Sequence, residues 1–242
     1  ESIDSTNLRA KELAAKSCME GTAVVADRQT SGRGRRGRHW ESPASSGVYM
    51  SVVLRPVMRP EQVPVIALMA GVAVCKVLTG LAAGIEIGLK WPNDVIVRGK
   101  KLCGILCEMG AELEAVSYVV AGIGLNVNNH SFNEEICDRA TSVYIETGKE
   151  FKRAEIVRAV LEEFEMLYKE LRSNGTGFIV SEWKRFSSTL GKRVKVAWGD
   201  RELLGIAEDI LPDGRLLLRL DDGETVELFS GEVSIRGTER YV

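Results

Sequence analysis

The sequence predicts an α+β protein of two domains: helices mixed with strands over residues 1–188, then a small all-β domain, a barrel, over residues 189–242. Three observations support this. Helical periodicity and short strand-like runs share the first part of the chain. After Gly191, only short apolar runs remain, separated by Gly-Asp, Asp-Gly and Asp-Asp-Gly turns, which is typical of a small barrel. The 242 residues allow one large domain and one small one.

Helices are expected where apolar residues recur at helical spacing. The capping residues Asp4-Ser5-Thr6-Asn7 precede a helix expected over 8–16. The apolar run 63–77 contains Pro64 and is shorter than the roughly 20 residues of a bilayer span, so we expect a buried core helix and no membrane anchor. That core helix is predicted over 61–81, and amphipathic helices are predicted over 153–171 and 178–186.

Strands are expected where short apolar or β-branched runs end in turn residues. The Arg98-Gly99-Lys100 turn predicts a hairpin between strands at 95–97 and 102–108. Alternation along the second of these strands places residues 101, 103, 105 and 107 on one face. The remaining strands are predicted over 22–26, 48–54, 85–90 and 116–121 in the first domain, and over 194–198, 202–210, 215–220 and 225–229 in the second.

Composition argues against several classes of function. The 32 Lys+Arg nearly balance the 34 Asp+Glu, giving a net charge of -2, which disfavours a general nucleic-acid or membrane-surface protein. The five cysteines form no Cys-x-x-Cys pair, and their number is odd. We therefore expect free thiols in a reducing compartment and neither disulfides nor a zinc site. No signal peptide is visible, so the expected location is the cytoplasm.

The densest functional signal is a basic segment with five arginines in the eleven residues 28–38. Gly32, Gly34 and Gly37 lie between the arginines and give a flexible backbone with accessible N–H groups, while guanidinium groups suit phosphate or carboxylate oxygens. A solvated basic loop and a nucleic-acid site are the alternatives. Because the cluster is short and no wider basic face accompanies it, we favour an anion-binding loop that closes over a small ligand. Residues 32–38 are called the arginine loop below.

Three further segments place polar or small residues at strand ends. The segment Lys90-Trp91-Pro92-Asn93-Asp94 sets an Asn-Asp pair at the tip of a rigid turn, although Asn-Asp is also ordinary turn chemistry. Lys101 begins an apolar strand and is either a solvated end or a cation directed into a site. Residues 122–126 carry two glycines that would let a ligand approach the backbone, but lack the third glycine of a dinucleotide-binding fingerprint.

Taken in order, these segments resemble biotin–protein ligases. The resemblance runs from residue 2 to about residue 237. It implies a catalytic domain over 1–188 related to class II aminoacyl-tRNA synthetases, with a mixed, mainly antiparallel sheet, followed by a Src-homology-3-type barrel over 189–242. The matching motifs are Ser5-Thr6-Asn7, Gly32-Arg33-Gly34-Arg35-Arg36-Gly37, Lys90-Trp91-Pro92-Asn93-Asp94, Lys101-x-x-Gly104-Ile105-Leu106-x-Glu108, Gly122-x-Gly124-x-Asn126 and Gly231-Glu232-Val233-Ser234-Ile235-Arg236.

The resemblance implies an ATP-dependent ligase that forms biotinyl-5′-adenylate and transfers biotin to a lysine of a biotin carboxyl carrier domain, as in acetyl-CoA carboxylase. Mg²⁺ is expected with ATP, and a homodimer is compatible with the family. Some members carry an N-terminal DNA-binding domain; none is expected in this chain, which starts just before Ser5, although Glu1 leaves open what precedes it. The alternative is a lipoate–protein ligase, related in fold and chemistry. Neither the carrier's identity nor the order of substrate binding follows from the resemblance.

The resemblance also implies roles for individual residues. Lys101, Arg35 and Asp94 are the expected catalytic residues: Lys101 neutralises charge between carboxylate and α-phosphate, the backbone at Arg35 helps to hold the carboxylate, and Asp94 lies near the metal and is the best candidate base. Biotin is expected at Ser5, Thr6, Asn7, Gln29, Gly32, Arg33, Gly34, Arg35, Lys101, Gly104, Gly122 and Gly124. ATP or the adenylate is expected at Arg36, Trp40, Lys90, Asn93, Asp94, Asn126 and Arg236.

Overall fold

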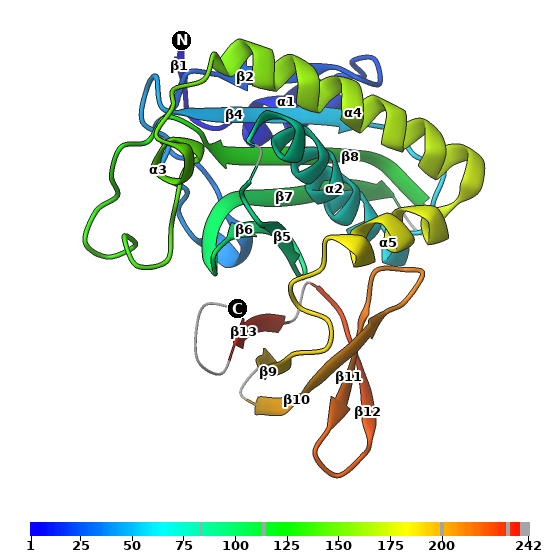
Figure 1. Ribbon diagram of the computed structural model, residues 1–242. Coiled ribbons are helices and arrows are strands. Elements are labelled where there is room, and N and C mark those ends of the chain that lie inside the picture. The colour runs from blue at the N-terminus through cyan, green and yellow to red at the C-terminus, as the bar shows by residue number, and fades with distance from the viewer. Residues whose placement is uncertain (83, 113–114, 199–200, 231–232, 238–242) are drawn as a thin grey trace.

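The structure, a computed structural model, describes residues 1–82, 84–112, 115–198, 201–230 and 233–237. Figure 1 shows a large sheet covered by helices and, at the C-terminal end of the chain, a smaller group of strands. Within the described residues, the large part holds a six-stranded antiparallel sheet, a two-stranded parallel sheet and five α-helices. The small part holds a five-stranded antiparallel sheet. The predicted α+β class with a small C-terminal β domain is confirmed.

The six-stranded sheet has the order β2-β4-β8-β7-β6-β5, and every neighbouring pair is antiparallel. The predicted hairpin between 95–97 and 102–108 is present as β6–β7. Strands β7 and β8 extend well beyond the apolar runs that predicted them, because backbone pairing between these two strands continues through glycines and polar residues. Strand pairing therefore carries the 122–126 segment into the sheet. The strands are β2 (Ala23–Ala26), β4 (Gly47–Leu54), β5 (Ile87–Lys90), β6 (Asp94–Val97), β7 (Lys100–Glu112) and β8 (Ala115–Asn126), and the parallel pair is β1 (Ser2–Ile3) with β3 (Arg28–Gln29).

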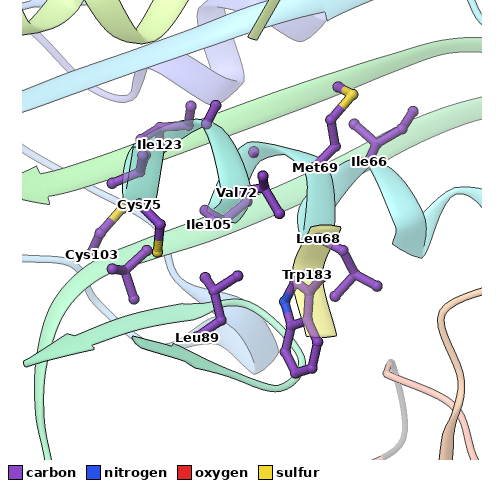
Figure 2. Close-up of a cluster of buried hydrophobic side chains, with 14 of the residues drawn as sticks. Ile66, Leu68, Met69, Val72, Cys75, Leu89, Cys103, Ile105, Ile123 and Trp183 are labelled. Carbon is purple, nitrogen blue, oxygen red and sulfur yellow. The ribbon is translucent and has the colours of Figure 1, made fainter. Parts of the chain in front are cut away.

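One face of this sheet carries the main core. Helices α2 (Pro64–Leu81), α4 (Arg153–Asn174) and α5 (Thr176–Arg185) cover it. Figure 2 shows Val72 and Cys75 of α2 beside Ile105 and Ile123 of the sheet. Burial raises the pKa of the Cys75 thiol, which therefore stays protonated and packs as a small apolar group.

The sequence of helix α2 fits two interpretations, a membrane segment and a core helix. Together with the short 3₁₀ turn before it, Pro60–Leu81 is long and apolar enough to cross a membrane by length and composition alone. However, 72% of its most apolar window is buried inside the protein, against the sheet and two other helices. The predicted core helix is confirmed.

The opposite face of the sheet is only partly covered. Helix α1 (Thr6–Ala15) packs Ala10 and Ala14 against Val53 of β4 and Val120 of β8. The helix begins two residues earlier than predicted, and no capping bond from the Ser5 side chain is present at its N-terminus. Instead, the side chains of its first turn are buried against the sheet, where they bond to other elements. The rest of this face is left for a cavity.

The predicted face of Lys101 is wrong, and a β-bulge explains why. Val95 of β6 pairs with Cys103, whereas the next residue, Ile96, pairs with Lys101, so Leu102 is an extra residue in β7. Leu102 and Cys103 are adjacent, yet both are buried in the main core. The bulge reverses the alternation and turns Lys101 away from the core onto the α1 side of the sheet. A Cβ atom at Gly104 would lie 3.0 Å from the Lys101 Cε.

The small domain has the strand order β12-β11-β10-β9-β13. Its core is formed by inward residues such as Val196, Ala207 and Leu218. Four of its strands were predicted from turn spacing; the fifth, β13, falls in the C-terminal tail, where only the family resemblance indicated structure. The strands are β9 (Arg193–Trp198), β10 (Arg201–Ile210), β11 (Leu216–Leu220), β12 (Thr225–Leu228) and β13 (Val233–Gly237).

Trp91 joins the two domains. Its side chain is only 1% exposed, and its indole N–H donates to the Gly214 carbonyl of the small domain at 2.9 Å. Its backbone N–H donates to Oγ1 of Thr189 at 2.9 Å. Trp91 belongs to the turn at residues 90–94, which is called the polar turn below. The contact between the two domains therefore reaches this turn directly.

We expect Trp91→Phe to lower the free energy of unfolding by about 1–3 kcal/mol, because the buried Gly214 carbonyl would lose its donor and the smaller ring would leave a void. Urea denaturation followed by circular dichroism measures the change. Leu204→Ala in the small domain is a suitable control, because Leu204 is 42% exposed. A Trp91→Phe midpoint equal to that of the wild type would contradict a linking role for the indole.

Candidate functional site

A cavity of about 810 Å³ opens on the α1 side of the sheet. The start of α1, the arginine loop, the polar turn before β6, strands β7 and β8, and the segment after β8 all contribute to it. Gly32 is not among the lining residues, and the Arg236 side chain lies outside the described residues. The sequence-predicted residues that line it are Ser5, Thr6, Asn7, Gln29, Arg33, Gly34, Arg35, Arg36, Trp40, Lys90, Asn93, Asp94, Lys101, Gly104, Gly122, Gly124 and Asn126.

One end of the cavity is a buried, uncharged polar network. Gln29 Oε1 accepts from the Thr6 backbone N–H at 2.8 Å and from the Thr6 hydroxyl at 3.1 Å. The Ser51 hydroxyl donates to Asn7 Oδ1 at 2.6 Å and lies 2.8 Å from Thr6 Oγ1. Ser51, fully buried in β4, was missed by sequence reasoning; its only signal is a single hydroxyl within an apolar strand.

The other end is charged. Lys101 Nζ lies 2.6 Å from the Asp94 carboxylate, and the Arg35 guanidinium donates to Asn93 Oδ1 at 3.0 Å. Asn93 in turn donates from Nδ2 to the Ile105 carbonyl at 2.7 Å, which fixes the turn against β7. Burial lowers the pKa of Arg35 and the nearby Asp94 opposes this, but a guanidinium remains charged at neutral pH. Two cations beside one carboxylate suit an anionic ligand.

The arginine loop folds back on itself beside this charged end. Gly34 N–H donates to the Arg38 carbonyl at 2.7 Å, and Trp40 N–H donates to the Gly32 carbonyl at 2.9 Å. A Cβ at Gly32 would lie 2.3 Å from the Trp40 carbonyl oxygen, so Gly32 is required by the base of the loop. Arg33 and Arg35 both turn back towards the protein, to a carboxylate and an amide respectively. This arrangement favours a small ligand over nucleic acid as the loop's target.

Glycines on β7 and β8 form the floor of the cavity. A Cβ at Gly124 would lie 2.6 Å from Nε1 of Trp40, and one at Gly104 would lie 3.1 Å from its ring. The indole therefore lies flat on the backbone at these two glycines, with Lys101 Nζ 5.4 Å from its centroid. Trp40 Nε1 is buried and has no hydrogen-bond partner among the described residues. Such a buried donor is a place where a ligand acceptor or water would bind.

Gly122 has a different role on the same floor. A Cβ there would lie 1.9 Å from Asn7 Oδ1, so only glycine allows the Asn7 amide to reach this part of the sheet. The absent side chains at 104, 122 and 124 thus admit two protein side chains, Trp40 and Asn7, and also line the cavity.

A whole wall of the cavity was missed by sequence reasoning, because residues 127–142 show neither helical nor strand periodicity. Asn126 anchors this wall: its Nδ2 donates to the Thr141 carbonyl at 3.0 Å. The backbone of Lys101 also bonds to this wall. Its N–H donates to the Arg139 carbonyl at 2.7 Å, and its carbonyl accepts from the Thr141 N–H at 2.9 Å. The helix α3 (Val143–Thr147) follows. The lining residues of this wall are Asn129, Ser131, Phe132, Asn133, Glu135, Ile136, Arg139 and Ala140.

The site does not contain a resident metal centre in the described part of the chain, where no group of three or more His, Cys, Asp or Glu side chains is placed to hold an ion. Asp94 offers one carboxylate and Asn93 one amide oxygen. A hard cation such as Mg²⁺ would take its remaining oxygens from a ligand or water.

Comparison with known proteins identifies the family. Residues 1–126 match the sequence profile of the biotin/lipoate A/B protein ligase family, and residues 189–236 match the biotin protein ligase C terminal domain. The bifunctional ligase/repressor BirA of Bacillus spizizenii is 38% identical over 96% of this chain and 72% of its own length. The biotin–[acetyl-CoA-carboxylase] ligase of Mycobacterium tuberculosis is 38% identical over 89% of this chain and 79% of its own length.

The solved structures agree with the sequence comparisons. The biotin protein ligase from Aquifex aeolicus, in complex with biotin and ATP, superposes with a TM-score of 0.85 at 34% identity, covering 98% of this chain and 97% of that one. The resemblance of the motifs is thereby confirmed, and the chain belongs to the biotin/lipoate A/B protein ligase family.

Proposed function

We propose that this ligase activates biotin with ATP as biotinyl-5′-adenylate and transfers the biotinyl group to a lysine of a biotin carboxyl carrier domain. The observation that carries the proposal is the division of one cavity into an uncharged polar end and a cationic end across a glycine floor. Biotin has the same division, with an uncharged ureido ring at one end and a carboxylate at the other. The relatives named for biotin ligation, and the neighbour solved with biotin and ATP, support this assignment.

The polar end fits the ureido ring. Thr6 is held by Gln29, and Asn7 is held by Ser51, so the donors and acceptors of these side chains are preorganised, and Ser5 lies next to them in the cavity lining. Buried polar groups of this kind reject an analogue that leaves them unpaired. Lipoate carries a dithiolane ring with no N–H or C=O group in place of the ureido ring, so this network favours biotin over lipoate.

The cationic end fits the reacting groups. The biotin carboxylate must attack the α-phosphorus of ATP, and both groups are anionic, so positioning and charge neutralisation dominate the barrier. Lys101 lies where it can neutralise both groups. The Arg35 side chain lies near Lys101, because Arg35 donates to Asn93 and Lys101 pairs with Asp94, the next residue. Lys101 is the proposed principal catalytic residue.

The adenylate lies towards Trp40 in this proposal. The exposed part of the indole offers a stacking surface for adenine, and its buried N–H still requires an acceptor. Arg36, Lys90 and Asn126 line the same cavity, and their contact with ATP or the adenylate is proposed on that ground. A role for Arg236 stays a prediction, because its side chain is outside the described residues.

Mg²⁺ bound to ATP is part of the proposal, with Asp94 and Asn93 as its protein-side neighbours. The donor set fits a cation that arrives with the nucleotide, since the residues that the structure describes provide one carboxylate here and no cage of ligands. When bound, the ion would neutralise phosphate charge. Asp94 is also the proposed base that accepts a proton from the carrier lysine.

The finer description of the fold is proposed on the same basis. An antiparallel sheet with its main layer of helices on one face is compatible with a class II aminoacyl-tRNA-synthetase-like catalytic domain over residues 1–188. Five short antiparallel strands are compatible with a Src-homology-3-type barrel over 189–242, and the C-terminal profile match begins at residue 189. The free state of all five cysteines supports a cytoplasmic location.

A homodimer is proposed through strand β2, which ends the six-stranded sheet and carries Val25 half exposed. Sedimentation velocity at several concentrations, with and without biotin and ATP, measures the oligomeric state. A single monomeric species under every condition would exclude the dimer.

Pyrophosphate release from ATP tests the proposed function. We expect release that depends on biotin and Mg²⁺, with little stimulation by lipoate at the same concentration. Addition of a biotin carboxyl carrier domain should then yield a product one biotinyl group heavier by mass spectrometry. Stimulation by lipoate and not biotin would instead favour the lipoate ligase alternative, and no stimulation by either would refute acyl-adenylate formation.

A further inference from the structure

Glu108 of β7 has no role in the function described so far, and it is not among the residues that line the cavity. Its side chain is 18% exposed and lies where α1 and the arginine loop both meet the sheet. Oε2 accepts from Asn7 Nδ2 at 3.0 Å. Oε1 accepts from Lys11 Nζ at 3.0 Å and lies 3.5 Å from an Arg33 guanidinium nitrogen. One carboxylate therefore contacts both α1 and the arginine loop, two walls of the proposed biotin site.

The contact with Asn7 fixes which way its amide faces. An amide nitrogen has two hydrogens, and Asn7 Nδ2 uses them on Glu108 Oε2 and on the Leu106 carbonyl at 3.1 Å. The amide oxygen must then point the other way, where it accepts from Ser51 at 2.6 Å and lies over Gly122 on the cavity floor. Without the Glu108 carboxylate, one of the two bonds that set this orientation is lost.

The charge of Glu108 is maintained at neutral pH. Partial burial opposes its ionisation, but the hydrogen bonds from Asn7 and Lys11, together with the charges of Lys11 and Arg33, lower the pKa of Glu108 below its usual value. The three contacts of Glu108 therefore involve a charged carboxylate, which accepts stronger hydrogen bonds from Asn7 and Lys11 than a neutral group would and forms an ion pair with Arg33.

We propose that Glu108 is a positioning residue for biotin: it orients the Asn7 amide oxygen towards the ligand and ties Arg33 of the arginine loop to the sheet. This rests on the proposed function, because the ligand at Asn7 is biotin. Glu108 itself touches neither substrate nor the reacting atoms. It acts on ligand binding through Asn7, and on the resting position of the loop through Arg33.

The first test is steady-state kinetics of Glu108→Gln, which keeps the size of the side chain and removes its charge. The single oxygen of the glutamine amide should turn to the cations Lys11 and Arg33, which leaves its NH2 group facing the Asn7 amide nitrogen. We therefore expect KM for biotin to rise between about tenfold and about a hundredfold, with kcat and KM for ATP within about twofold of wild type. Lys11→Gln is the matched control, since Lys11 contacts the same carboxylate from the surface; its KM for biotin should equal that of wild type.

A double-mutant cycle separates positioning from general support of the fold. If Glu108 acts on biotin through Asn7, then Glu108→Gln should change KM for biotin no more than about twofold in an Asn7→Ala background. Equal effects of Glu108→Gln in both backgrounds would overturn the proposal. Should the glutamine variant fail to fold, Glu108→Asp keeps the charge but withdraws the carboxylate from Asn7, and the same KM increase is expected.

Limited trypsin digestion tests the Arg33 contact without any ligand. Cleavage after Arg33 should be several-fold faster in unliganded Glu108→Gln than in wild type, and unchanged in Lys11→Gln. Equal cleavage of all three chains, or a wild-type KM for biotin in a folded Glu108→Gln, would overturn the positioning role. If wild type shows no biotin-dependent pyrophosphate release, the proposed function fails, and with it the inference about biotin, whereas the digestion still tests the loop contact alone.

Discussion

Lys101→Ala is expected to slow biotinyl-adenylate formation by about two orders of magnitude, equivalent to about 3 kcal/mol of transition-state stabilisation. The bulge at Leu102 places the ammonium group beside Asp94 and the glycine floor, where the carboxylate and α-phosphate would meet. Its removal leaves the charge between these anions without its main cation. Binding of ATP should weaken far less, because the rest of the cavity is unchanged.

Single-turnover measurement of adenylate formation, with ATP affinity measured separately by calorimetry, distinguishes the two effects. Lys100→Ala is the matched control: it removes the same group one residue earlier in β7, where Nζ donates to the Cys137 carbonyl and the residue does not line the cavity. Adenylation by Lys101→Ala within a few-fold of wild type would refute the assigned role.

Arg35→Gly is expected to release the adenylate and not to abolish its synthesis. The substitution keeps the backbone N–H, and Lys101 remains. It removes the guanidinium that donates to Asn93 and holds the loop at the charged end. A glycine favours the open loop by about 0.5–1 kcal/mol, and loss of the charged contact adds about 1–3 kcal/mol. Loop opening should become roughly tenfold to several-hundred-fold more favourable.

Released biotinyl-adenylate would acylate amines on unrelated proteins. The measurement incubates the variant with biotin, ATP and serum albumin, and probes the albumin for biotin. Arg28→Gly is the control, because Arg28 lies in β3 outside the cavity lining. Albumin labelling by Arg35→Gly at the wild-type level, with a normal rate of adenylate synthesis, would show that this side chain does not retain the intermediate.

Much of this arrangement could be predicted from the sequence, because its signals are local. The nearly continuous apolar run of β4 and the mainly apolar sequence of α2 predict their burial directly. The arginine loop and the Lys90–Asp94 turn are marked by composition, and the structure places both on one cavity. How these side chains bind ligands stays a prediction.

The parts that could not be predicted depend on partners distant in the sequence. The face of Lys101 is set by a bulge, which exists only in the pairing of β7 with β6. The wall at 127–142 is irregular backbone, held by Asn126 and by the main chain of Lys101. Ser51 reads as one polar residue in an apolar strand until Asn7 and Thr6 are placed beside it.

The glycine floor sets a limit on redesign of this enzyme for altered substrates. Pockets are commonly enlarged by trimming a side chain to accept a bulkier compound, but Gly104, Gly122 and Gly124 have no side chain to trim. There the backbone at the glycines is already covered by the Trp40 indole and the Asn7 amide, so room towards the sheet is gained by shortening one of these two side chains and not at the glycines. Variants that accept larger biotin analogues must therefore be sought at Trp40, at Asn7 and in the wall at 127–142, where side chains form the boundary.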